Sequence, residues 1–114
     1  MADLYEVLRL FQTRVNAEPT VKKMLRDWDR RLAIEATDGP SYTVIVQGGQ
    51  MVDILAEVAP DPDVSLMADT DVLTGIFTGT LNPMWAYNAG DLAFHGSTPD
   101  EMRLDAVVQY VWKT

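Results

Sequence analysis

The sequence of 114 residues contains no cysteine and only one histidine, His95. The lack of cysteine excludes disulfide bonds, thiol catalysis and cysteine-based metal sites. Because a zinc site draws three or four ligands mainly from cysteine and histidine, a single histidine argues against zinc. The aspartates between Asp61 and Asp71 lack the glycine and glutamate that complete a calcium loop, so turn and capping roles explain them better. We therefore expect neither a metal nor a cofactor.

The sequence also lacks a recognisable catalytic motif. No serine lies in the Gly-x-Ser-x-Gly motif of a nucleophile elbow, and Gly48-Gly49 lacks the lysine of a phosphate loop. Ser97 is close to His95 in the sequence, but a catalytic triad also needs an orienting acid and an oxyanion hole. We therefore predict a protein that is not an enzyme. A small acyl-handling hydrolase that uses His95 is the least favoured alternative.

No apolar run approaches the roughly 20 residues that cross a membrane as a helix. The first residues, MADLYEVLRLFQ, include two acids and are unlike a signal peptide. The final Trp112-Lys113-Thr114 is unlike a peroxisomal address. We therefore expect a cytoplasmic protein, and the length suits one domain spanning residues 1–114.

Basic residues are scarce outside the first part of the chain. The formal net charge is −8, and seven of the nine basic residues lie within residues 1–31. The acidic remainder argues against nucleic acid as a partner. The basic cluster has two interpretations: a solvated face, which we favour, or a transient contact with an anionic membrane surface. The residues of that contact would be Lys22, Lys23, Arg26, Arg30 and Arg31.

Apolar periodicity predicts an α+β fold, with a five-stranded, largely antiparallel sheet covered on one face by helices. The paired glycines Gly48-Gly49 predict a tight hairpin turn, and Thr98-Pro-Asp-Glu101 is typical of a capping box with Thr98 as the N-cap. Helical spacing predicts helices over 3–16, 20–25, 69–79, 83–89 and 99–112. Alternation predicts strands over 28–35, 42–46, 51–58, 64–68 and 92–96.

The sequence is rich in flexible and large apolar side chains, with six methionines and three tryptophans. Composition alone favours a role in filling the core, but methionine also adapts to varied apolar partners. On a helix over 83–89, Met84 and Tyr87 are three residues apart and share a face. Trp85 is turned from Met84 by about 100° and therefore faces another side or lies at a pocket mouth.

Residues 63–96 resemble the sterol carrier protein 2 family in its stand-alone form. That family typically shows a strand, an acidic helix start, the pattern Gly-x-x-Asn-Pro-Met-x-Ala-(Tyr/Phe)-x-x-Gly, and a lysine-rich strand. The matching segments are Ala68-Asp-Thr-Asp-Val-Leu-Thr-Gly-Ile-Phe-Thr-Gly79, Asn82-Pro-Met-Trp-Ala-Tyr-Asn-Ala-Gly90 and Asp91-Leu-Ala-Phe-His-Gly96. The family's strand lysines correspond here to Asp91, Ala93 and His95, which removes a charged surface that the family carries.

The resemblance implies an apolar tunnel between the sheet and the helices. It implies non-catalytic binding and carriage of a fatty acid, fatty acyl-CoA, sterol or phospholipid. The apolar stripe of the helix over 99–112 needs an apolar partner that the ligand would partly supply, so we expect this helix to act as a partly mobile lid. The alternative function is a protein-interaction or homodimerisation module that uses the same apolar groove. Together with the spacing, the resemblance predicts these ligand contacts: Val44, Leu55, Leu73, Ile76, Phe77, Leu81, Met84, Trp85, Tyr87, Leu104, Val107, Val108 and Val111.

Overall fold

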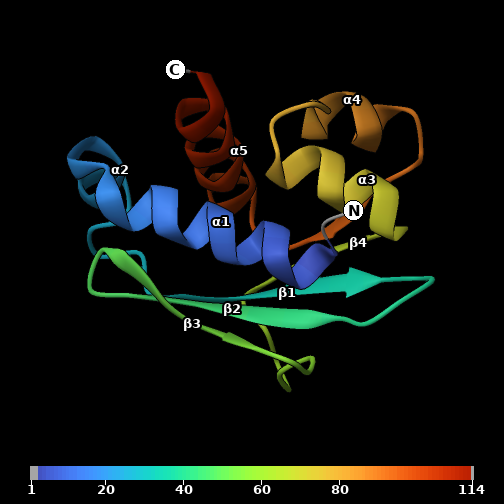
Figure 1. The fold of residues 1–114 in the computed structure, drawn as a ribbon, viewed down its shortest axis with the longest axis horizontal. Coiled ribbons are helices and arrows are strands. Elements are labelled where there is room, and N and C mark those ends of the chain that lie inside the picture. Colours follow the sequence, from blue (N-terminus) through green and yellow to red (C-terminus); the bar gives the residue numbers. More distant parts are fainter. Residues whose placement is uncertain (1–2, 114) are drawn as a thin grey trace.

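A five-stranded mixed sheet forms the base of the computed structural model, which describes residues 3–113 (Figure 1). The strand order is β3-β2-β1-β4-β5. β1 and β4 pair in parallel, and the other neighbouring strands pair antiparallel, so the predicted sheet is confirmed. Residues 1, 2 and 114 of the predicted domain range lie outside the described residues. The strands are β1 (Arg30–Ala36), β2 (Tyr42–Gln47), β3 (Gln50–Leu55), β4 (Val64–Ala68) and β5 (Ala93–His95).

The helices lie together on one side of the sheet (Figure 1). Local signals account for most of their starts: Asp3, Asp69 and Asn82 each accept hydrogen bonds from backbone N–H groups of the first helical turn. The helices are α1 (Leu4–Ala17), α2 (Pro19–Met24), α3 (Thr70–Phe77), α4 (Pro83–Asn88) and α5 (Thr98–Lys113).

The cap of α5 differs from the sequence prediction. Thr98 is already the first residue of the helix, and the side-chain oxygen of Ser97 accepts the Asp100 N–H at 3.2 Å. The capping residue is therefore Ser97 and not Thr98. Either hydroxyl is chemically suited to this role, and the backbone path into the helix decides between them.

The third strand is shorter than predicted and contains a β-bulge. Its pairing with β2 is irregular, since Ile45 faces Asp53 while the next residue, Val46, faces Met51. The extra residue reverses the alternation along β3. Ile54 therefore lies on the helix side with Val44, and Leu55 pairs with Thr43 on the other side.

The loop that follows β3 covers part of the outer face of the sheet around Thr43. The Thr43 hydroxyl donates a hydrogen bond to the Glu57 carbonyl at 2.7 Å and accepts one from the Ala59 N–H at 2.8 Å. These bonds explain how Thr43 is fully buried on the side away from the helices. The hairpin before β3 is as predicted, because Gly48 and Gly49 adopt φ values of 63° and 78°.

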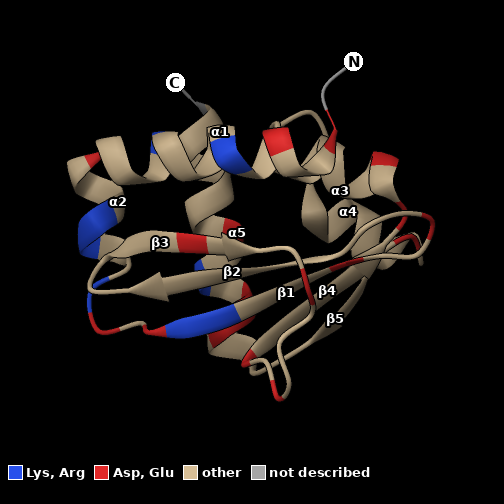
Figure 2. Cartoon of the chain, turned by 60° about the horizontal axis from the view of Figure 1, so that its bottom comes forward, with Lys and Arg blue, Asp and Glu red and all other residues tan. Residues whose placement is uncertain are grey.

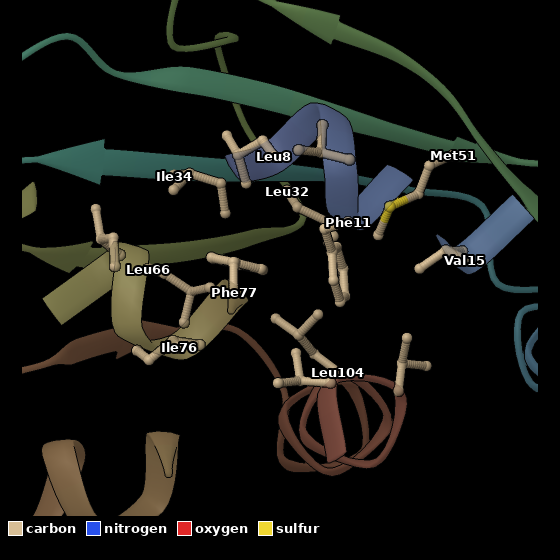
Figure 3. Close-up of a cluster of buried hydrophobic side chains, with 14 of the residues drawn as sticks. Leu8, Phe11, Val15, Leu32, Ile34, Met51, Leu66, Ile76, Phe77 and Leu104 are labelled. Carbon is tan, nitrogen blue, oxygen red and sulfur yellow. The ribbon is translucent and has the colours of Figure 1, made fainter. Parts of the chain in front are cut away.

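The space between the sheet and the helices is filled by a continuous apolar core (Figure 3). Phe11 of α1 and Phe77 of α3 meet edge to face, with ring centroids 5.2 Å apart, and both are almost completely buried. Leu8 adds to this cluster from α1 and Leu104 from α5. Among the described residues, the structure does not show the tunnel that the family resemblance implies.

Candidate ligand-binding site

An apolar cavity of about 30 Å³ lies where β4 and β5, at one edge of the sheet, meet α3, α4 and α5. Leu66 and Phe94 are cross-strand partners in β4 and β5 and form its floor. The two charged residues of the lining, Glu101 and Asp105, come from α5 and are partly exposed, and the cavity surface itself is almost wholly apolar. The full lining is Leu66, Ile76, Phe77, Pro83, Met84, Tyr87, Leu92, Phe94, Glu101, Leu104, Asp105 and Val108.

Six of the predicted contact residues meet at this cavity: Ile76, Phe77, Met84, Tyr87, Leu104 and Val108. The strand residues in the lining were missed by the sequence prediction. Alternation marks Leu66, Leu92 and Phe94 as inward-facing, but only the β4–β5 pairing places them beside α4. Glu101 and Asp105 were missed because periodicity assigns charged residues to the solvent face.

The other predicted contacts lie outside this cavity. Val44 is buried in the core beneath α1, two strands away from β4, and the bulge in β3 turns Leu55 to the outer face of the sheet. Leu81 and Trp85 border a separate surface hollow beside Trp112. The remaining three are buried core residues that do not line the cavity: Leu73, Val107 and Val111.

α4 forms the least firmly packed wall of the cavity. Ala86 is its only buried residue, whereas Met84 and Tyr87 line the cavity with more than a third of their surface exposed. Trp85 points away from the cavity and is 73% exposed. Of the two positions that the sequence left open for Trp85, the structure shows the one on another side of the helix, although Trp85 was also among the predicted ligand contacts.

α5 is held more tightly than α4. The buried Asp100 accepts hydrogen bonds from Trp28 Nε1 at 2.7 Å and from Arg30 Nε at 3.1 Å. Burial alone would raise the pKa of the Asp100 carboxyl, but the hydrogen bonds from Arg30 and Trp28 outweigh it and hold that pKa below its usual value. The guanidinium of Arg103 also donates to the Met24 carbonyl at 2.8 Å. These contacts tie the first half of α5 to α2 and β1.

The cavity is too small for a lipid in this conformation. A volume of about 30 Å³ holds about two water molecules at most, whereas pockets for organic ligands usually measure about 300–1,000 Å³. Any lipid-sized ligand would require part of the wall to move.

The described residues offer little for catalysis or metal binding. His95 is exposed on β5, and the Ser97 hydroxyl already accepts the Asp100 N–H. Within residues 3–113 there is no group of three potential metal ligands. No helix in the same range is long and apolar enough to cross a bilayer.

The predicted basic cluster is divided by the fold. Arg30 pairs with Asp100, and Arg31 donates hydrogen bonds to the Pro60 and Asp61 carbonyls. Arg31 nevertheless stays exposed on β1, and the other exposed residues of the cluster lie at the α2 end of the molecule (Figure 2): Lys22, Lys23 and Arg26.

Helices on one face of a mixed five-stranded sheet, with an apolar cavity at the sheet edge, define a small α+β domain suited to apolar ligands. Residues 8–109 match the SCP-2 sterol transfer family, and the chain belongs to that family. This membership supports lipid binding or transfer as its general function. No curated protein matches the chain by sequence.

Solved structures show the same fold. The sterol carrier protein domain 2 of Helicoverpa armigera superposes with a TM-score of 0.76 and 15% identity, covering 96% of this chain and 87% of that one. Palmitated SCP2L2 from Aedes aegypti superposes with a TM-score of 0.69 and 19% identity, covering 94% of this chain and 95% of that one. A ubiquinone synthesis protein, UbiJ-SCP2, superposes with a TM-score of 0.71 and 21% identity, covering 93% of this chain and 88% of that one. At these identities, the likeness concerns the fold alone.

Proposed function

We propose that this protein binds and carries an apolar, lipid-like molecule without transforming it chemically. The main observation in support of this proposal is the apolar cavity at the sheet edge. Its walls come from α3, α4, α5 and the segments of β4 and β5. Each methylene group that leaves water for such a site contributes about 0.8 kcal/mol to binding. A fatty acid, fatty acyl-CoA, sterol or phospholipid offers enough methylene groups. As part of this proposal, we predict that residues 1–114 form a single lipid-binding domain.

The cavity enlarges by movement of α4 in this proposal. α4 buries only Ala86, while α5 is anchored through Asp100, Trp28 and Arg30. Local opening costs least where few apolar contacts are lost. The packing therefore favours α4 as the mobile wall. The helix over 99–112, which we predicted to be the lid, is the less favoured candidate. Outward movement of α4 displaces Met84 and Tyr87 and joins the cavity to solvent.

The first test is to compare the purified protein by native and denaturing mass spectrometry. A mass excess in the native spectrum that disappears on denaturation would reveal a co-purified lipid. Met84→Asp should abolish binding of the extracted lipid, because an unpaired carboxylate in an apolar pocket is strongly disfavoured. The matched control is Met102→Asp, since Met102 lies on α5 outside the cavity lining and is 67% exposed. Equal binding by both variants would contradict the proposal.

A protein-interaction or homodimerisation module is the alternative function. It is favoured by Trp85, which is 73% exposed on the outer side of α4, because exposed apolar groups often mark interfaces. Light scattering coupled to size-exclusion chromatography distinguishes the two functions. A lipid-free dimer that Trp85→Ser converts into a monomer would support this alternative.

Delivery to a membrane is a further part of the proposal. Lys22, Lys23 and Arg26 are exposed basic residues close together in the sequence and are available for contact with anionic lipids. Replacing all three with Gln should weaken sedimentation with phosphatidylserine vesicles, while leaving lipid binding in solution unchanged. We place the protein in the cytoplasm, as the sequence analysis expects.

A further inference from the structure

The outer side of α4 is uncharged, partly apolar and open to solvent. Residues 72–90 contain no charged residue, although 23% of the chain is charged, and Figure 2 accordingly shows α4 without a blue or red segment. Between Met84 and Gly90, every residue except Ala86 is exposed. Trp85 is more exposed than any other large apolar side chain of the described residues. Exposed apolar surface that charge does not interrupt often marks a contact surface.

Trp85 has no aromatic or cationic partner within the described part of the chain that would explain its position. The other two tryptophans are each held by a contact. Trp28 Nε1 donates a hydrogen bond to Asp100, and the guanidinium carbon of Arg14 lies 4.4 Å from the centre of the Trp112 ring. Within residues 3–113, the Trp85 ring takes part in neither an aromatic pair nor a cation–π contact. Its ring is therefore available to a partner outside the chain.

A surface hollow extends this uncharged surface from α4 to the second half of α5. Leu81, Trp85 and Trp112 border the hollow, and its described lining contains no charged residue. Pro83 and Val108 line both the hollow and the apolar cavity. The uncharged surface therefore continues to the wall of the cavity that would hold the ligand.

The chemistry of this surface favours a lipid bilayer over a second protein chain. Tryptophan and tyrosine are enriched where a membrane meets water, because a large ring with one polar group suits both sides of that boundary. The net charge of −8 disfavours an anionic membrane for this contact, whereas a zwitterionic bilayer presents no net charge. A protein partner would cover α4 and hold the mobile wall closed, but a fluid bilayer lets that wall move. The bilayer also supplies lipids.

We propose that the outer side of α4 docks on the interface of a zwitterionic bilayer, with Trp85 inserted among the head groups. This inference rests on the proposed lipid carriage and names the surface through which the ligand is exchanged. Movement of α4 then opens the cavity toward the bilayer instead of toward water. The surface is separate from Lys22, Lys23 and Arg26, because α2 and α4 lie at opposite ends of the molecule in both Figure 1 and Figure 2.

Co-sedimentation with phosphatidylcholine vesicles tests this surface. The wild-type protein should bind the vesicles, and Trp85→Ser should lower the partition coefficient at least about fivefold, because a large interfacial ring is lost. Met102→Ser is the matched control, since Met102 is 67% exposed on α5 and lies outside the lining of both the cavity and the hollow. This control, and the replacement of Lys22, Lys23 and Arg26 with Gln, should leave the partition coefficient unchanged. Added salt should also have no effect, because it screens only charged contacts.

Tryptophan fluorescence of the wild-type protein provides a second measurement that needs no variant. Acrylamide is an uncharged quencher that acts from water, so it should quench the exposed Trp85 more than the buried Trp28. Phosphatidylcholine vesicles should reduce this quenching, because docking removes Trp85 from water. The lipid extracted from the protein, added without vesicles, should not reduce it, since Trp85 lies outside the cavity lining.

The outcomes separate this inference from the proposed function. Equal vesicle binding by the wild-type protein and Trp85→Ser, or quenching that vesicles do not change, would overturn α4 as the docking surface. Binding that requires phosphatidylserine would also overturn it, and so would a lipid-free dimer that depends on Trp85. A co-purified lipid found by native mass spectrometry would leave lipid carriage intact in the first three cases. Absence of any bound lipid would instead contradict the proposed function, whatever the vesicles show.

Discussion

Asp100→Asn should destabilise the protein by about 2 kcal/mol at pH 7. Asp100 is 8% exposed and accepts hydrogen bonds from Trp28 Nε1 and Arg30 Nε. A hydrogen bond to a charged group contributes about 1.5–3 kcal/mol. The asparagine oxygen can still accept the bond from Trp28, but its amide nitrogen then faces the Arg30 donor. The Arg30 side chain is 32% exposed, so water compensates for part of the loss.

The effect should depend on pH in a defined direction. Because the pKa of Asp100 is lowered in the folded protein, the unfolded chain binds this proton more readily. The carboxylate therefore stabilises the fold above its unfolded pKa of about 3.9, and this stabilisation is lost as the pH falls through the lower folded pKa. The difference in stability between wild type and Asp100→Asn should be greatest near pH 7 and should shrink below about pH 4.

Urea denaturation followed by tryptophan fluorescence measures both effects, with midpoints converted to free energies of unfolding by linear extrapolation. Glu57→Gln serves as the control, because it removes one negative charge at an exposed position after β3. A loss below about 0.5 kcal/mol for Asp100→Asn at pH 7 would refute the assigned role of this carboxylate. A loss that stays constant down to pH 3 would refute the titration argument while leaving the hydrogen bonds in place.

Three further predictions follow from the same structure. Gly79 and Gly90 adopt φ values of 80° and 83°, but an added Cβ would clash with the Trp112 side chain at Gly79 and would meet no atom within 4 Å at Gly90. Gly90→Ala should cost about 1 kcal/mol for its backbone conformation, and Gly79→Ala clearly more, as thermal denaturation would show; equal losses would contradict the assigned clash. Hydrogen exchange should be faster in α4 than in α5, and the extracted lipid should slow it mainly in α4; equal protection of the two helices would count against α4 as the mobile wall. His95→Ala should change lipid affinity by less than about threefold, or roughly 0.7 kcal/mol; loss of binding, or of an esterase activity, in a folded variant would instead favour an enzyme.

Sequence alone identified the elements whose signals lie within a few residues of each other. The hairpin at Gly48-Gly49 was readable, because turn geometry depends on adjacent backbone groups. The sequence also predicted that Met84 and Trp85 lie on different sides of α4, because consecutive residues of a helix are turned by about 100°. The segment around α4 also carried the family resemblance.

Tertiary structure alone decided where those elements meet. The parallel pairing of β1 with β4 places β5 at the sheet edge, so Leu66 and Phe94 form the cavity floor while Val44 lies two strands away. A single extra residue in β3 turned Leu55 to the outer face. Periodicity places Asp105 in solvent, but the meeting of α5 with α3 and α4 at the cavity leaves it partly buried in the lining. Such positions depend on contacts between residues far apart in the chain, and no local pattern records them.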